Sequence, residues 1–261
     1  MNIGVQTFTI RKAQKKDMAK AYGELAGMGI CDLEIARIDF TRENAEKVKA
    51  LKAELNVHPV SIQVKPKYVF GDPSAVVDFC RITGCKNVVI SMLPFECILG
   101  SEEKFYAFAA SLDAQYELYE KEGITLAYHH HNWEYVRLKN GKTRMQELLS
   151  ETRKIKFVTD TYWSARSGVS PERQIREFGS RLLGIHLRDL SFKPKFLDVV
   201  ARDAAIGDGV IDFAEVLRAA REVGCEYAVL EQNSKDPYAD IARGYKNVLK
   251  IKSQIEEISI L

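Results

Sequence analysis

The sequence predicts an α/β fold, a single (β/α)8 barrel formed by residues 1–261. Three observations predict it: a length of 261 residues, a regular alternation of short β-branched runs with longer helical segments, and glycines at the ends of several helices. The length is usual for one α/β barrel and large for most other single domains. Because strand and helix alternate throughout, the sheet is expected to be parallel.

Short apolar runs rich in β-branched residues predict the strands. There are eight of them: Ile3–Phe8, Asp32–Ile35, Val60–Val64, Asn87–Ile90, Thr125–Tyr128, Lys156–Thr159, Leu182–Leu187 and Tyr227–Leu230. The segments between these runs have helical periodicity instead. Phe105, Phe108 and Leu112, for example, fall on one face of a helix, which is expected to pack against the sheet.

Capping signals mark where the helices begin and end. Three starts combine an N-cap residue with proline at the first helical position: Asp72-Pro73, Ser170-Pro171 and Asp236-Pro237. Four ends carry a glycine just before the next strand: Gly29, Gly84, Gly123 and Gly224. Glycine readily adopts the left-handed conformation that ends a helix and turns the chain back toward the sheet.

An open, doubly wound sheet is the main alternative for such an alternating chain. That fold normally carries a glycine-rich phosphate-binding turn after its first strand. Here the first strand runs into Gln6-Thr7-Phe8-Thr9-Ile10-Arg11, which contains no glycine. Eight repeated units without that turn favour closure into a barrel.

The charge balance limits the choice of partners. Lys plus Arg number 38 and Asp plus Glu 36, so the formal net charge is only +2. Such a chain offers no general field for nucleic acid or an anionic membrane. It also shows no basic leader and no run of about 20 apolar residues, and its five cysteines form no C-x-x-C pair. We therefore expect a cytoplasmic protein with a small-molecule substrate, and Phe95 is a candidate contact in a homo-oligomer.

Polar residues follow most of the predicted strands, at the end where barrel enzymes build their active sites. In chain order they are Glu34, Gln63, Lys65, His129, His130, His131, Asp160, His186 and Glu231. The fifth to eighth strands thus offer His, Asp, His and Glu at one rim, where their side chains converge near the barrel axis. So many buried polar groups would be costly unless a divalent cation compensated them. The pattern predicts a shared metal site.

The run of three histidines leaves one choice open. Side chains alternate across a strand, so His129 and His131 share one face and His130 takes the other. Periodicity alone allows either the odd-numbered pair or His130 to face the barrel axis.

Six phrases stand in an order and spacing that a known family shares: Gly4–Arg11, Tyr128–Glu134, Thr159–Trp163, Gly184–Asp189, Gly207–Phe213 and Leu230–Gln232. They resemble the xylose-isomerase-like TIM barrels, a family of sugar phosphate isomerases, epimerases and related lyases. The resemblance covers nearly the whole chain and implies one divalent metal ion (Mn, Co, Zn or Mg). Asp160, His186 and Glu231 match three ligand positions of the family. His129 matches the fourth, where the best-known epimerases have a glutamate, and this mixed donor set shifts the preference toward Mn, Co or Zn.

The chemistry consistent with these residues is proton abstraction beside a carbonyl group through an enediolate. Glu231 is the expected base, and His131 or Glu134 is the expected acid. Four residues are candidates to bind the substrate: Glu34, Lys65, Trp163 and Arg188. Substrate specificity is expected to lie in the loops after the first four strands and in the stretch Leu190–Ile206.

The expected activity is that of a sugar or sugar phosphate isomerase or epimerase acting on a small polyhydroxylated substrate. The alternative is a dehydratase or lyase that performs β-elimination on a keto sugar or inosose, and the histidine at position 129 favours it. A non-catalytic sugar-binding barrel is a further alternative. A DNA repair nuclease of the endonuclease IV branch is disfavoured, because that branch uses more histidine ligands and a basic rim.

Overall fold

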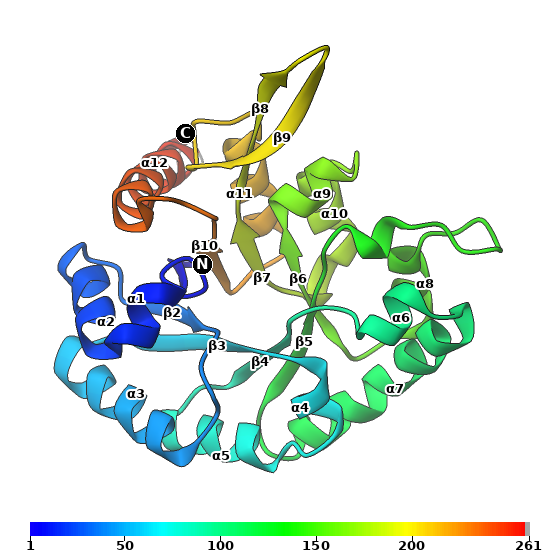
Figure 1. The fold of residues 1–261 in the computed structure, drawn as a ribbon, viewed down its shortest axis with the longest axis horizontal. Coiled ribbons are helices and arrows are strands. Elements are labelled where there is room, and N and C mark those ends of the chain that lie inside the picture. The colour runs from blue at the N-terminus through cyan, green and yellow to red at the C-terminus, as the bar shows by residue number, and fades with distance from the viewer. Residues whose placement is uncertain (259–261) are drawn as a thin grey trace.

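Eight parallel strands form a closed barrel in the computed structural model, which describes residues 1–258. They are β1 (Asn2–Gln6), β2 (Asp32–Ile35), β3 (His58–Val64), β4 (Asn87–Ile90), β5 (Thr125–His129), β6 (Lys156–Asp160), β7 (Leu182–Leu187) and β10 (Tyr227–Leu230). Their order around the barrel is β1-β10-β7-β6-β5-β4-β3-β2, and β2 pairs with β1 to close the ring (Figure 1). The eight predicted strands are confirmed, each within two residues of its expected bounds. The last three residues of the predicted 1–261 domain lie outside the described residues.

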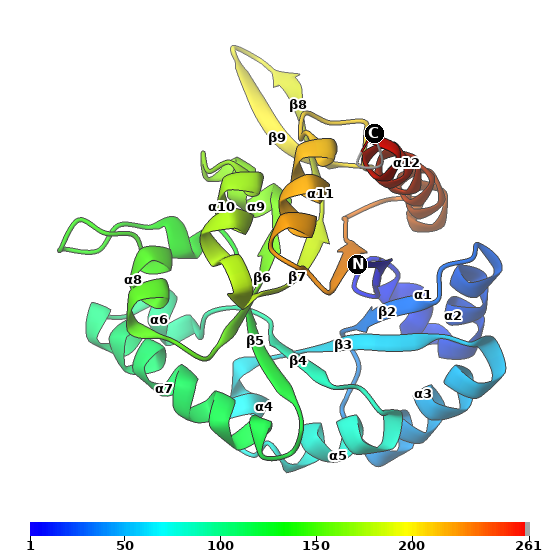
Figure 2. The same cartoon turned by 180° about the vertical axis from the view of Figure 1, so that it is seen from behind.

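Helices surround the barrel (Figures 1 and 2). They are α1 (Arg11–Lys16), α2 (Met18–Gly27), α3 (Arg42–Leu55), α4 (Pro66–Phe70), α5 (Ser74–Thr83), α6 (Phe95–Leu99), α7 (Glu102–Glu120), α8 (Arg144–Glu151), α9 (Thr161–Arg166), α10 (Pro171–Phe178), α11 (Phe213–Glu222) and α12 (Pro237–Ile258), with short 3-10 turns η1 (Trp133–Tyr135) and η2 (Gly179–Arg181). Across residues 1–258, no helix combines the length and the apolar character needed to cross a membrane.

The capping signals hold with one exception. The four glycines predicted to end helices all have φ between 70° and 79°, in the left-handed region. The Ser170-Pro171 start is confirmed at α10. At α5, however, Pro73 takes the N-cap position and the helix begins at Ser74. Asp72 still caps this turn from one position further out, because its carboxylate accepts a hydrogen bond from the Ser74 N–H.

Two apolar regions hold the barrel together. The larger one fills the space between the strands and the surrounding helices. The smaller one lies inside the barrel and consists of Val89, Ala127, Val158, Leu183, Tyr227 and Val229. Filling the barrel with side chains below its carboxyl end leaves that end free for polar residues, as is usual in this fold.

An additional element leaves the barrel after β7. β8 (Asp189–Lys195) and β9 (Asp198–Ala204) pair antiparallel as a two-stranded hairpin, which projects away from the barrel (Figures 1 and 2). The sequence predicts only a pocket-flanking stretch here. A large cavity opens at the carboxyl end of the barrel, and none of its described lining residues comes from 190–206. The reason is that the hairpin is directed outward and only its base approaches the barrel end.

Candidate metal centre and active site

Alternation along the strands aims one set of polar side chains into the barrel. On β5, Ala127 faces the interior, so His129, two residues later, faces it as well. The same spacing leads from Val158 to Asp160 on β6, and Glu231 follows β10 in the same way. The odd-numbered histidines therefore turn toward the barrel axis, which settles the choice that periodicity left open.

His130 takes the opposite face, between the strands and helix α10. Its Nε2 lies 2.9 Å from Thr159 Oγ1 and accepts a hydrogen bond of 3.2 Å from the Asp160 backbone N–H. Its ring lies beside that of Phe178. Burial lowers the pKa of His130 to about 4, so the ring is neutral and fixes β6 beside β5 from outside the barrel.

Four side chains converge at the carboxyl end of the barrel: His129, Asp160, His186 and Glu231. All four are buried, and one potential ligand atom from each lies within 4.8 Å of the others. His129 Nε2 is 3.7 Å from Asp160 Oδ2, and His186 Nδ1 is 2.7 Å from Glu231 Oε2. They come from β5, β6, β7 and the residue after β10, which are adjacent in the barrel. The structure thus brings the four predicted ligands together.

The two imidazoles of this cluster are held by their far nitrogens. His129 Nδ1 lies 3.2 Å from the Ser91 carbonyl oxygen, and His186 Nε2 lies 2.7 Å from Glu34 Oε1. A ring nitrogen that donates to such an oxygen carries the proton, which leaves a lone pair on the other nitrogen. Those other nitrogens, His129 Nε2 and His186 Nδ1, face carboxylate oxygens of the cluster: Asp160 Oδ2 at 3.7 Å and Glu231 Oε2 at 2.7 Å. Two imidazole nitrogens that face two carboxylates inside a buried cluster are a donor set that fits a divalent cation.

The pKa of His186 shows which charge the cluster favours. Burial opposes a charged ring, but the carboxylates of Glu34 and Glu231 raise the pKa of His186 to about 10. The cluster therefore stabilises positive charge at this point. A proton and a metal ion compete for it, since a metal ligand must be deprotonated.

Arg188 places a buried positive charge beside the carboxylates. Its Nη1 is 3.3 Å from Asp160 Oδ2 and 3.4 Å from Glu231 Oε1, and its Nη2 is 2.7 Å from Asp203 Oδ1 on β9. Burial alone would raise the carboxylate pKa values. Arg188 and the neighbouring histidines instead lower the pKa of Asp160 well below its usual range and that of Glu231 to about 2. Both carboxylates are therefore ionised at neutral pH.

Glu34 lies below the cluster and does not line the cavity. It is fully buried, with Oε1 at His186 and with Oε2 accepting hydrogen bonds from Ser61 Oγ and Tyr227 OH. Both oxygens are thus engaged inside the barrel, where Glu34 orients His186. This corrects the expectation that Glu34 binds hydroxyl groups of the substrate.

Glu134 also points away from the cavity. Its carboxylate contacts Tyr128 OH and accepts a hydrogen bond of 2.8 Å from the His131 backbone N–H. It is fully buried, and burial raises the pKa of Glu134. Glu134 therefore holds the loop that presents His131, which corrects the expectation that it delivers a proton to the substrate directly.

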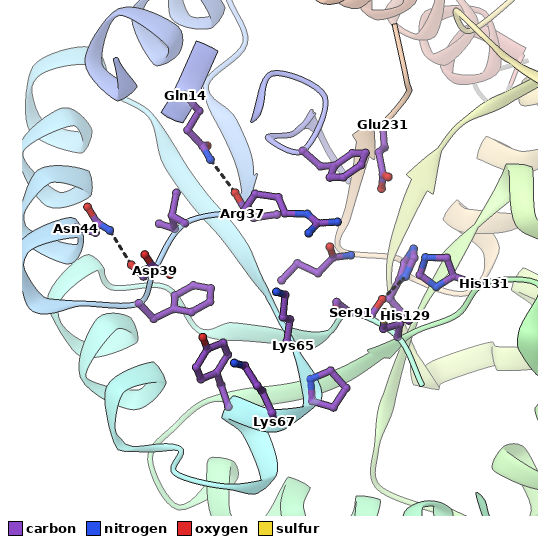
Figure 3. Close-up of a pocket in the computed structure, with 18 of the residues that line it drawn as sticks. Gln14, Arg37, Asp39, Asn44, Lys65, Lys67, Ser91, His129, His131 and Glu231 are labelled. Carbon is purple, nitrogen blue, oxygen red and sulfur yellow. Dashed lines mark hydrogen bonds between the residues drawn. The ribbon is translucent and has the colours of Figure 1, made fainter. Parts of the chain in front are cut away.

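A cavity of about 1770 Å³ opens at the cluster (Figure 3). Its lining includes six of the predicted site residues: Lys65, His129, His131, Trp163, Arg188 and Glu231. The rings of His131 and Trp163 are 5.3 Å apart. Their nitrogens His131 Nδ1 and Trp163 Nε1 are buried and make no hydrogen bond in the described part of the chain, so both can serve a ligand.

Two groups that hold the site were missed by the sequence reasoning. Ser91 follows β4 directly and contributes a backbone carbonyl, which a search for polar side chains does not reveal. Asp203 holds Arg188 from β9, and without the hairpin no sequence signal places it near the barrel end. For Ser91 a signal existed, because its position just after a strand is shared with the predicted ligands.

The chain matches one family model. Residues 17–251 match the model described as "Xylose isomerase-like TIM barrel". Among curated proteins, an inosose dehydratase from Klebsiella pneumoniae is 24% identical over 171 residues, which make up 60% of this chain and 56% of the relative. The match thus spans little more than half the length of that relative.

Solved structures share the fold of the chain over nearly its full length. A sugar phosphate isomerase/epimerase from Parabacteroides distasonis has a TM-score of 0.78 at 19% identity, covering 96% of this chain and 94% of that one. A xylose isomerase-like TIM barrel protein from Mycobacterium smegmatis, solved in complex with magnesium, has a TM-score of 0.72 at 11% identity and covers 97% of each chain.

Proposed function

Because the chain belongs to the xylose isomerase-like TIM barrel family, we propose that it is a divalent-metal-dependent enzyme that removes a proton beside the carbonyl group of a small polyhydroxylated, sugar-like substrate. One observation carries the proposal: imidazole lone pairs and ionised carboxylates from His129, Asp160, His186 and Glu231 converge at a cavity. Two nitrogen donors favour Mn, Co or Zn over Mg, although the structural neighbour from Mycobacterium smegmatis contains magnesium.

Glu231 is the base in this proposal. When bound, a divalent ion supplies polarisation of a carbonyl oxygen and of the hydroxyl group beside it. Glu231 lines the cavity and is ionised at neutral pH, so it can take a proton from the adjacent carbon. Its low pKa makes it a weak base, which means that the carbonyl group must already have acidified that carbon. Arg188, 3.4 Å from Glu231 Oε1, helps to orient the carboxylate.

His131 is the second group that can handle a proton. Burial lowers the pKa of His131 to about 3, so the ring is neutral, and its Nδ1 has no hydrogen-bond partner within residues 1–258. Trp163 offers a flat face to a sugar ring beside it. Arg188 and Lys65, both in the cavity lining, are suited to bind substrate oxygens.

Two outcomes can follow once the proton has left. Return of a proton to the substrate carbon skeleton gives an isomerase or epimerase. In a dehydratase, the carbon–oxygen bond of the β-hydroxyl group breaks, its electron pair leaves with the oxygen, and protonation of that oxygen gives water. Elimination is favoured because His129, and not a second carboxylate, lines the cavity together with Glu231. Within residues 1–258, Glu231 is the only carboxylate of the cluster in the cavity lining, so a symmetrical pair of carboxylate bases is lacking. The similarity to an inosose dehydratase supports the same outcome.

Metal analysis and deuterium wash-in test the proposal together. The metal content of purified wild type and of Glu231→Gln is measured, and each metal-loaded protein is incubated in D₂O with a panel of neutral keto sugars, keto sugar phosphates, keto sugar acids and inososes. Proton NMR follows the loss of the exchanging C–H signal and identifies the product. We expect about one ion per wild-type chain and an exchange rate that falls by at least about 100-fold in Glu231→Gln.

Glu226→Gln is the matched control, since Glu226 is exposed and stands just before β10. It should keep wild-type exchange. A metal-loaded wild type that exchanges no proton on any member of the panel would contradict the proposal and favour a non-catalytic sugar-binding barrel. Reprotonated products indicate an isomerase or epimerase, and loss of water indicates a dehydratase.

A further inference from the structure

One wall of the cavity is basic. Arg37 comes from the loop after β2, and Lys65 and Lys67 come from the loop and first turn after β3. Figure 3 shows Arg37 and Lys65 extending into the same central space, with the labelled histidines and Glu231 on its other side. The basic wall, defined as these three residues, thus faces the metal-ligand cluster across the cavity.

The cations of the basic wall are not neutralised by neighbours. In the described chain, none of the three makes an ion pair with a carboxylate. Arg37 instead lies 5.1 Å from the centre of the Phe8 ring, and Lys67 lies 4.6 Å from that of Tyr68. Aromatic faces hold cations in place without cancelling their charge.

The whole cavity has the same excess of positive charge. Its described lining contains eight Lys or Arg side chains and four Asp or Glu side chains. Lys47 differs from the basic wall although it lines the same cavity, because it pairs with Glu43 at 2.6 Å. Like charges repel at close quarters, so a ligand that brings negative charge is favoured over a neutral one.

The backbone at Arg37 adopts an unusual conformation, which hydrogen bonds to the preceding residue hold in place. Its φ is 60°, in the left-handed region that residues other than glycine rarely adopt. The preceding residue is fixed on both sides: the Ala36 N–H donates to Thr7 Oγ1 at 2.9 Å, and the Ala36 carbonyl accepts from Gln14 Nε2 at 2.8 Å. Such conformations are concentrated at ligand-binding sites. Solvation explains a single exposed lysine, but it does not explain a constrained arginine beside two further unpaired cations.

On the basis of the proposed function, which makes this cavity the substrate site, we propose that the basic wall binds an anionic group of the substrate, either a carboxylate or a phosphate. The anion binds Arg37, Lys65 and Lys67 by charge-assisted hydrogen bonds. The carbonyl end of the same molecule reaches across the cavity to Glu231. The enzyme therefore selects polyhydroxylated substrates that carry a negative charge at one end.

Three ligands of matched size test this selection on the metal-loaded protein by calorimetry. Glucitol is the neutral reference, gluconate adds a carboxylate, and glucitol 6-phosphate adds a phosphate. We expect at least one anion to bind wild type about tenfold tighter than glucitol, or more, and the larger gain identifies which anion the site takes. In Arg37→Met and Lys65→Met this ratio should fall to about 2 or less. Lys47→Met, whose lysine is already paired, should keep the wild-type ratio.

Two results would overturn the basic wall as an anion site. One is equal binding of neutral and charged ligands by wild type. The other is a gain that survives in both Arg37→Met and Lys65→Met, since the anion would then bind elsewhere, for instance at the metal ion. After either result, wild type that still exchanges deuterium into neutral keto sugars would show that only the anion site is wrong and that the proposed function stands. If no ligand binds and no substrate exchanges, the proposed function fails with it.

Discussion

The two histidines of the metal-ligand cluster differ in what holds them. His129 is held by a backbone carbonyl, whereas His186 is held by the carboxylate of Glu34. Burial would keep Glu34 protonated, but His186 and Ser61 lower the pKa of Glu34, so it remains a carboxylate. A carboxylate partner fixes the orientation of a ligating imidazole and raises its basicity. His186 is therefore the ligand whose affinity for a cation depends most on a neighbouring side chain.

Glu34→Gln tests this dependence. The amide has nearly the same shape but lacks the charge, so His186 loses the partner that fixes its lone pair toward the cluster. We expect the metal dissociation constant to rise by about 10- to 100-fold, measured by competition with a chelating dye. The exposed control Glu226→Gln should leave the constant unchanged. A constant for Glu34→Gln within twofold of wild type would show that Glu34 only fills space.

The raised pKa of His186 also predicts how metal binding depends on pH. In the metal-free protein the extra ring proton stabilises the fold fully below pH 6.5, the ordinary pKa, and this contribution is lost as the pH rises through about 10. A metal ion must displace that proton, so its binding strengthens over the same range. The carboxylates of Asp160 and Glu231 are ionised throughout and add no dependence there.

The increase in melting temperature on metal loading should accordingly grow from about pH 6.5 to about pH 9. Calorimetric scans of metal-loaded and chelator-treated protein at each pH measure it. Titrations in buffers of different ionisation enthalpy should show about one proton released per ion at neutral pH. A temperature difference that shrinks as the pH rises would contradict the assignment of His186 as a ligand.

At the scale of elements, β7 and β10 are fitted to each other at one glycine. Gly184 on β7 pairs with Tyr227 on β10, and a Cβ added at Gly184 would lie 2.4 Å from the Tyr227 ring. That ring is buried in the barrel and its hydroxyl group donates to Glu34 at 3.0 Å. It therefore cannot move without disturbing the support of His186.

Gly184→Ala should destabilise the barrel by about 1–3 kcal/mol, the usual cost of an extra carbon in a full core, as measured by urea unfolding. The matched control is Gly23→Ala on α2, where an added Cβ meets nothing within 4 Å. It should stabilise by about 0.5–1 kcal/mol, because alanine restricts the unfolded chain and favours helix. Equal effects of the two substitutions would mean that the strand contact is looser than the structure indicates.

The hairpin is the element that the sequence pattern does not predict. Its two-residue connection is Phe196-Leu197, whereas such turns usually contain asparagine, aspartate or glycine. Leu197 nevertheless adopts a φ of 59°, a left-handed conformation that is rare for leucine and could not be predicted from the residue type. Pro194 within β8 also argues against a strand by its type. By contrast, the barrel strands have β-branched runs, and several of them follow a helix that ends at a glycine. These local signals predict the strands without knowledge of their tertiary contacts.

At the scale of the whole molecule, the sequence predicts the repeated strand–helix units of the barrel. It does not predict side-chain orientations that depend on residues brought together by folding. The barrel and the convergence of His129, Asp160, His186 and Glu231 follow from strand order and alternation. The inward turn of Glu34 does not, because a residue at a strand end can serve either the cavity or the interior, and only the packed barrel decides between them. The basic wall is predicted in part: Lys65 is a candidate from its position after a strand, whereas Arg37 and Lys67 are seen to share its cavity only in the folded barrel.

The most direct test of the central claim, one divalent metal centre formed by the four converging side chains, is an anomalous-scattering map from crystals grown with Mn²⁺ or Zn²⁺. The predicted result is a single strong peak bound by His129 Nε2, His186 Nδ1 and the carboxylates of Asp160 and Glu231. An empty position there, or an ion held by other residues, would contradict the assignment of these side chains as a metal centre.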